Sequence, residues 1–63
     1  MKTIGKWGDK ELELGRKFDK QQELELTILD KDVDYTSIWL NVEEVKQLIE
    51  HLQNVMFKLY IEN

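Results

Sequence analysis

The sequence lacks cysteine and proline altogether, and it contains only three glycines, Gly5, Gly8 and Gly15. Without cysteine, neither disulfide bonds nor thiolate metal sites can stabilise the fold, and the composition suits a reducing cytoplasm. Without proline or glycine-rich tracts, the chain has no linker of the flexible or polyproline kind. We therefore expect residues 1–63 to form a single domain, with residues 1–9 as an irregular lead-in because they show no hydrophobic period.

Long apolar runs and an excess of positive charge are also missing. No stretch approaches the length of a membrane span, and no apolar signal-peptide core follows the basic start of the chain. We therefore expect a soluble, cytoplasmic protein that makes no membrane contact. The formal net charge of −4 argues against direct binding to nucleic-acid phosphates and favours a protein partner with a basic face.

The length of the chain limits the core that it can build. A folded monomer of about 60 residues buries only about 60% of the surface that its unfolded chain exposes, so its stability is marginal. Folds of this size usually rely on disulfides, metals or oligomerisation. Because cysteine is absent, the sequence predicts a homo-oligomer, most simply a dimer.

Three stretches alternate between apolar and polar residues, which is the period-two pattern of a strand with one buried face. They cover residues 10–18, 23–29 and 35–40, and their apolar residues fall mostly on even-numbered positions. Short polar breaks separate the three stretches. We therefore expect an antiparallel meander of three strands whose even-numbered residues share one face.

Loop length decides which residues of such a meander face each other. A five-residue loop at 30–34 sets Thr27 opposite Ser37 and keeps the apolar positions on one face of the sheet. In the first hairpin, a loop of three or of five residues also keeps the apolar positions of both strands on one face. Either loop sets Lys17 opposite a glutamate, Glu23 or Glu25. Cross-strand pairs of opposite charge stabilise a sheet by roughly 0.2–1 kcal/mol.

From Val42 onward the hydrophobic period changes to that of a helix. Asn41 is placed to cap the first turn and Glu44 to accept from the Asn41 amide, as in a capping box. We expect the helix to span about residues 42–58, although residues 55–61 also alternate and leave a short fourth strand as the alternative. The apolar stripe of the helix comprises Val45, Leu48, Ile49, Leu52, Met56 and Leu59.

These patterns together predict an α+β fold. Three antiparallel strands form a meander, and one C-terminal helix follows and packs on one face of the sheet. The even-numbered sheet face and the helix stripe are both apolar, so we expect them to form the core against each other. A single helix covers a single face, and the odd-numbered face is therefore left open.

No residue pattern supports catalysis or a metal site. Asp30, Asp32 and Asp34 have the opening spacing of a calcium loop, but Tyr35 and Asn41 stand where that loop requires glycine and a bidentate glutamate. The single histidine has no suitable partner on its helix face. A cysteine nucleophile, a phosphate-binding glycine loop and a Ser/His/Asp set are all missing. We therefore expect a non-enzymatic protein without a cofactor or metal.

The odd-numbered face of the sheet is the candidate binding surface. It combines two aromatic residues, Tyr35 and Trp39, with acidic side chains. Aromatic patches of this kind supply many interface hot spots, and the acidic surroundings favour a partner that contributes lysine or arginine. The predicted partner-binding residues are Leu29, Tyr35, Trp39, Glu23 and Glu25. The alternative is that Trp7 and the lead-in fold over this patch and bury it.

A second set of apolar side chains lies near the end of the helix pattern, in addition to the stripe. It comprises Val55, Phe57, Tyr60 and Ile61. Packing of these residues against a twofold mate would give an isologous homodimer, in which both subunits use the same patch. We therefore predict that they form the dimer interface.

The segment I-W-L-N-V-E-E-V-K-Q-L-I-E-H-L, which spans residues 38–52, leads from a strand into a helix in a chain rich in Lys, Glu, Ile, Leu and Asn. In this style the chain resembles the small proteins encoded by bacteriophages of low-GC Gram-positive bacteria. The resemblance implies a protein that acts in the host cytoplasm. Such proteins bind a host protein, including components of bacterial defence, or sequester a nucleotide signal.

Three functions follow as hypotheses. The first is an inhibitor or modulator, with a role in anti-defence, that binds a larger host protein as a homodimer. The second is an oligomeric sponge for a small anionic or nucleotide ligand. The residues that would bind this ligand are Arg16, Lys17, Lys46 and Lys58. The third is an acidic DNA mimic in which rows of glutamates stand in for phosphates. These glutamates are Glu11, Glu13, Glu23 and Glu25.

Overall fold

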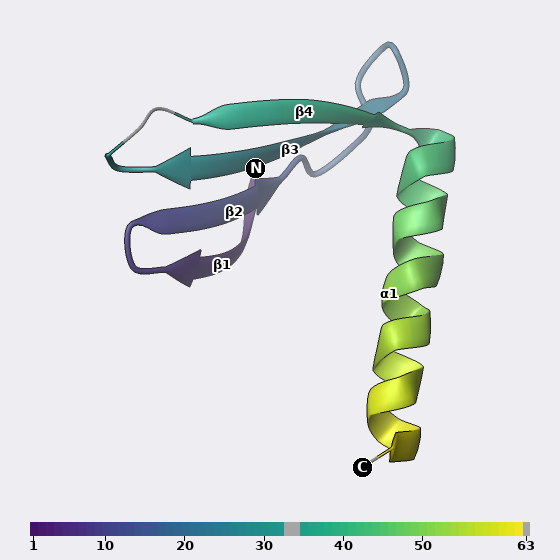
Figure 1. Cartoon of the computed structure of the whole chain (residues 1–63). Coiled ribbons are helices and arrows are strands. Elements are labelled where there is room, and N and C mark those ends of the chain that lie inside the picture. Colours follow the sequence, from purple (N-terminus) through teal and green to yellow (C-terminus); the bar gives the residue numbers. More distant parts are fainter. Residues whose placement is uncertain (33–34, 63) are drawn as a thin grey trace.

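The computed structural model describes residues 1–32 and 35–62. Four antiparallel strands form one sheet in the order β1-β2-β3-β4, and a single helix follows the last strand (Figure 1). The elements are β1 (Lys2–Trp7), β2 (Lys10–Leu14), β3 (Glu23–Asp30), β4 (Thr36–Asn41) and α1 (Val42–Glu62). The predicted α+β class and the antiparallel meander are confirmed, and the sheet has four strands where the sequence predicts three.

The additional strand, β1, lies in the segment for which the sequence predicts an irregular lead-in. Its pairing with β2 shifts register between Thr3 and Gly5, and this irregularity interrupts the alternation by which strands are recognised. A two-residue turn at Gly8 and Asp9 closes the hairpin, and Gly8 has a φ of 62°. Glycine adopts that φ without a steric penalty, so Gly8-Asp9 is the signal of this hairpin in the sequence.

β2 ends at Leu14, well before residue 18, and residues 15–22 form a loop. Asp19 organises this loop, because its Oδ1 accepts hydrogen bonds from the amides of Gln21 and Glu23 at 2.9 and 3.0 Å. Lys17 therefore lies in the loop, outside the strand pairing that would set it opposite a glutamate. The described residues instead form two other cross-strand ion pairs, Lys6 with Glu11 at 3.2 Å and Lys10 with Asp30 at 3.7 Å.

The hairpin of β3 and β4 has the register that the sequence predicts, with Thr27 opposite Ser37. In the turn between them, the Asp32 amide donates to the Asp30 side chain at 3.1 Å, a local hydrogen bond by which aspartates favour turns. Asp34, the third acid of the calcium-like spacing, lies outside the described residues. The register places the even-numbered residues of β2, β3 and β4 on one face, called here the even face, and the odd-numbered residues on the odd face.

The even face carries the apolar side chains of the sheet. Its apolar residues in β2, β3 and β4 are Leu12, Leu14, Leu24, Leu26, Ile28, Ile38 and Leu40. Trp7 pairs with Lys10 and therefore also lies on this face. The Trp7 indole rests against Gly5, since a Cβ at that glycine would come within 2.6 Å of the ring. Trp7 thus extends the even face onto β1.

The start of α1 has the capping box that the sequence predicts. The Asn41 amide donates to Glu44 Oε1 at 2.9 Å, and the Glu44 amide donates to Asn41 Oδ1 at 2.8 Å. The helix then continues to Glu62, past the expected end near residue 58. Residues 55–61 are therefore helical, and the alternative of a short fourth strand in this segment does not occur.

α1 does not cover the sheet. Among the described residues it contacts β3 and β4 but neither β1 nor β2, and Val45 is the only one of its described side chains that is not exposed. In Figure 1 the helix runs beside the ends of the strands, not across them. The predicted packing of the helix along one sheet face is thus not present. The physical reason is that Val42 follows Asn41 directly, with no loop in which the chain could turn back.

As a result, the single chain has no closed core. Among the described residues no hydrophobic side chain is buried, and Thr27, with 4% exposure, is the one buried residue. The radius of gyration is 14.0 Å, whereas a compact chain of this length has a value of about 11 Å. The accessible surface is 5618 Å² for a mass of 7.6 kDa, whereas a compact chain of that mass exposes about 4,300 Å².

Candidate functional site

The centre of the odd face is a cluster of two hydroxyl groups and one carboxylate. Thr27 and Ser37 are cross-strand partners, and their hydroxyl oxygens lie 2.8 Å apart. Both hydroxyls reach the Oε2 atom of Glu25, at 3.1 Å from Thr27 and 3.0 Å from Ser37. These hydrogen bonds hold the Glu25 carboxylate in one orientation on the sheet through Oε2, and among the described residues no hydrogen bond to Oε1 is present.

Trp39 lies directly opposite Glu25 in the pairing of β3 with β4. Its side chain is 52% exposed, while Glu25 is half-buried. Directly opposed residues in an antiparallel pair have Cβ atoms about 4.5–5.5 Å apart. The Trp39/Glu25 pair therefore combines an exposed indole with an oriented carboxylate at contact distance.

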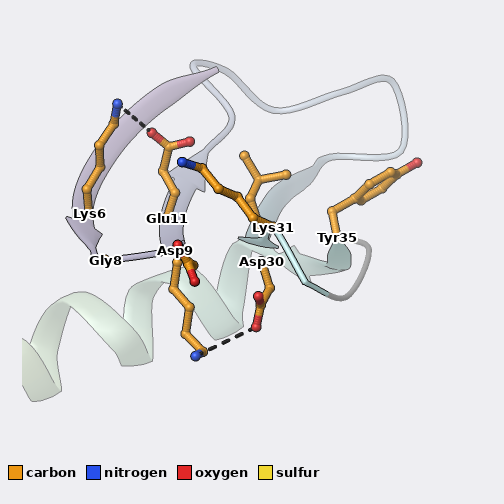
Figure 2. A pocket seen from close by; sticks show the side chains of 9 residues that line it. Lys6, Gly8, Asp9, Glu11, Asp30, Lys31 and Tyr35 are labelled. Carbon is orange, nitrogen blue, oxygen red and sulfur yellow. Dashed lines mark ion pairs between the residues drawn. The ribbon is translucent and has the colours of Figure 1, made fainter.

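The other predicted aromatic residue, Tyr35, lies at the opposite end of the odd face, beside the β3–β4 turn. It is 65% exposed and lines a hollow of about 390 Å³ together with Leu29, Lys6, Glu11 and residues of both turns. Figure 2 shows the Lys6–Glu11 ion pair and the Lys31 side chain within this hollow. Lysines and acidic residues alternate around it, so the hollow has no strong charge preference.

The predicted partner-binding residues therefore fall into two groups. Trp39, Glu25 and Glu23 lie toward the end of the sheet where α1 begins, and Leu29 and Tyr35 lie near the β3–β4 turn. Four residues along a strand span roughly 13 Å, so the two aromatic side chains do not form one continuous patch. The hydroxyl cluster between them was not singled out from the sequence, although the predicted pairing of Thr27 with Ser37 contains the signal for it.

Trp7 and the lead-in do not bury the odd face, so this alternative is wrong. Trp7 lies on the even face, and residues 2–7 form the edge strand β1. Met1 reaches the middle of the odd face, with its Sδ atom 3.9 Å from Thr27 Oγ1. Trp39 and Tyr35 both remain exposed.

The predicted dimer residues of α1 are exposed as well. Their exposed fractions range from 49% for Val55 to 75% for Tyr60. Tyr60 and Phe57 also border a shallow, almost wholly apolar groove with Leu52, Gln53 and Met56. This half of the helix is therefore an open apolar surface.

The even face is a further open surface, which the sequence predicts to be covered. Ile28 and Ile38, in the middle of the face, are 48% and 50% exposed. A small apolar hollow beside Ile28 is bordered by Trp7 and Leu12. Sequence patterns did not indicate this opening, because they report which residues are apolar but not the angle at which the helix leaves the sheet.

The basic residues predicted for an anionic ligand are spread over two elements. Arg16 and Lys17 lie in the loop after β2, while Lys46 and Lys58 lie on α1. The two helical lysines are twelve positions apart, which corresponds to roughly 18 Å along the axis. The glutamates of the DNA-mimic hypothesis all lie on the odd face, in two separate pairs on β2 and β3.

Two further findings concern other classes of site. Within residues 1–32 and 35–62, no group of three or more His, Cys, Asp or Glu side chains is placed to hold a metal ion. In the same residues, no helix is both long enough and apolar enough to cross a membrane.

Comparison of the chain with protein-family models, with curated proteins and with solved structures found no match.

Proposed function

We propose that this chain is a small non-enzymatic interaction protein that inhibits or modulates a larger protein with a basic face. The observation that carries the proposal is the Trp39/Glu25 pair, an exposed indole directly opposite a carboxylate that two hydroxyl groups hold in place. The resemblance to small phage proteins favours a bacterial host protein as the partner and an anti-defence role. The working form in this proposal is a homodimer.

The chemistry of the pair suits an arginine or a lysine of the partner. A cationic side chain that lies over an exposed indole gains about 0.5–1 kcal/mol from the ring. The same cation can donate to Glu25 Oε1, and hydrogen bonds to charged groups contribute about 1.5–3 kcal/mol. Because Glu25 is already oriented, little conformational freedom is lost when the partner binds.

The charge of the whole chain supports the same kind of partner. A net charge of −4 raises the rate at which a basic surface approaches. A binding role accounts for the exposed aromatic residues of the odd face without any chemical step.

The proposal can be tested with a fluorescently labelled arginine-rich peptide, whose anisotropy reports binding to the full chain. We expect Glu25→Gln to weaken binding roughly 10-fold, because the oriented charge is lost. Glu50→Gln on the exposed face of α1 is the matched control, since it removes the same charge away from the odd face. Trp39→Ala should also weaken binding, by about 2- to 5-fold, because the contact of the cation with the indole is lost.

The comparison of the two glutamate variants decides the outcome. Equal weakening by Glu25→Gln and Glu50→Gln would mean that the peptide responds to net charge only, and the Trp39/Glu25 site would have to be given up. Binding that Trp39→Ala leaves unchanged would lead to the same conclusion. A glutamate-rich peptide of equal length serves as the negative control.

A further inference from the structure

The single chain leaves two complementary apolar surfaces apart from each other. One is the even face, with Ile28 and Ile38 about half exposed, and the other is the stripe of α1, with Leu52 and Met56 equally open. Both belong to one short chain, yet α1 contacts only β3 and β4 and leaves β1 and β2 untouched among the described residues. A stable fold therefore needs something else to cover the even face.

The helix of the same chain is held away from that face. The two hydrogen bonds between Asn41 and Glu44 fix the first turn of α1, and the helix begins at the residue that follows β4. A helix that folds back over its own sheet needs a connection of several residues, which this junction does not contain. The apolar stripe of α1 is suited to cover the even face. The α1 helix of the same chain cannot reach that face, so the covering helix has to come from another copy.

We propose that α1 of a second copy lies across the even face, and that the exchange is reciprocal, so that each helix of a twofold dimer covers the partner's sheet. The inference rests on the homodimeric form in the proposed function and names its interface. Such an arrangement is isologous and closes on itself, as cyclic dimers do. The helix stripe and the even face would then form the core that a single chain lacks.

The accessible surface that the single chain leaves exposed is large enough for a dimer interface of this kind. The chain exposes 5618 Å², about 1,300 Å² more than a compact chain of its mass. Burial of this excess on both copies gives about 2,600 Å², which lies in the range of obligate dimers. Weak or transient contacts bury much less, so the area favours a permanent interface, and the matching helix stripe of a second copy can supply it.

The dimensions agree as well. With 21 residues, α1 is about 31 Å long, and four strands spaced by about 4.8 Å form a sheet roughly 15–20 Å wide. The helix can therefore cross the whole sheet with its first turns still attached to its own β4. The odd faces remain outside the core, so the dimer would present two Trp39/Glu25 pairs to partners.

Because the chain has no cysteine, an introduced cysteine is the only thiol that a cross-linker can react with, and cross-linking can therefore test the interface. Two single-cysteine chains, Ile28→Cys on the even face and Leu52→Cys on the helix stripe, are unfolded, mixed and refolded together, then treated with a short bis-maleimide. We expect a cross-linked heterodimer, identified by its mass. Glu50→Cys on the polar side of α1 replaces Leu52→Cys as the matched control and should give no heterodimer. Circular dichroism checks that each variant folds.

The other outcomes separate failure of this interface from failure of the proposed function. A dimer by native mass in which Leu52→Cys links only to itself would show helix-to-helix packing, and the exchange would be disproved while the homodimer stands. A monomer by native mass, with a link only when both cysteines are on one chain, would show that α1 folds over its own sheet. Peptide binding by Trp39 and Glu25 is measured independently of both results.

Discussion

Asn41 and Glu44 exchange two hydrogen bonds at the junction of β4 and α1. The Asn41 amide donates to the Glu44 carboxylate at 2.9 Å, and the Glu44 amide donates to the Asn41 side chain at 2.8 Å. This pair both starts the helix and sets its direction, because no residue separates the strand from the helix. The open even face and the extended shape of the chain follow from this short junction.

The capping pair gives a first prediction. Asn41→Ala removes the side-chain acceptor for the Glu44 amide, and the loss of such a cap costs about 1 kcal/mol. We expect the free energy of unfolding, measured in urea at constant protein concentration, to fall by about that amount. Asn54→Ala, in the exposed middle of α1, is the control and should leave stability unchanged or slightly raised, because alanine has the higher helix propensity. An equal loss from both variants would argue against a cap.

A second prediction concerns the contact of Trp7 with Gly5. A Cβ at position 5 would come within 2.6 Å of the indole, so Gly5→Ala must displace the ring. Because the Trp7 indole is 61% exposed and can move aside, we expect a loss of only about 0.5–1 kcal/mol, together with a change in Trp7 emission in a Trp39→Phe background. Gly15→Ala is the matched control, since its Cβ would meet no atom closer than 3.4 Å. Unchanged emission in Gly5→Ala would contradict the contact.

These two pairs also show how far the sequence could predict the fold. The Asn41/Glu44 cap was predictable because its chemistry is local, and the faces of β2 to β4 were predictable because alternation reports them. β1 was missed, since the irregular pairing between Thr3 and Gly5 interrupts its alternation and Gly5 has no side chain to contribute. The angle of α1 was missed because a periodic pattern carries no information on orientation.

The candidate site was predictable in its members but not in its arrangement. Trp39 and Tyr35 are on the face that the alternation predicts, and both are exposed. Their separation into two groups depends on the distance along β4, and the orientation of Glu25 depends on hydroxyl groups of two strands. Such relationships require the register of the sheet, which short-range patterns determine only in part.

The hydroxyl cluster provides a third prediction. Thr27 is the one buried residue of the described chain, and Thr27→Val keeps its shape while it removes the hydroxyl shared with Ser37 and Glu25. We expect a loss of about 1 kcal/mol in unfolding free energy and weaker binding of the arginine-rich peptide, because only the Ser37 hydroxyl then holds Glu25. Thr36→Val, on the same sheet but outside the cluster, is the control. Peptide binding that is identical in both variants would mean that Thr27 does not orient Glu25.

The last prediction uses two neighbours in β4 that point to opposite faces. Ile38 is 50% exposed on the even face and Trp39 is 52% exposed on the odd face. In a monomer, their similar exposure gives no reason to expect that Ile38→Ala destabilises the fold more than Trp39→Ala. In a dimer closed over the even face, stability depends on protein concentration, and each tenfold dilution lowers the apparent free energy of unfolding by about 1.4 kcal/mol. We expect Ile38→Ala to lower the stability and shift the native mass toward the monomer.

Trp39→Ala should leave both the native mass and the concentration dependence intact while it weakens peptide binding. The two variants thus separate self-association from partner recognition, since residues 38 and 39 are adjacent in sequence and equally exposed. Unfolding midpoints of the unsubstituted chain that do not change with dilution would contradict the dimer. A Trp39→Ala chain that dissociates would place the odd face, not the even face, between the two copies.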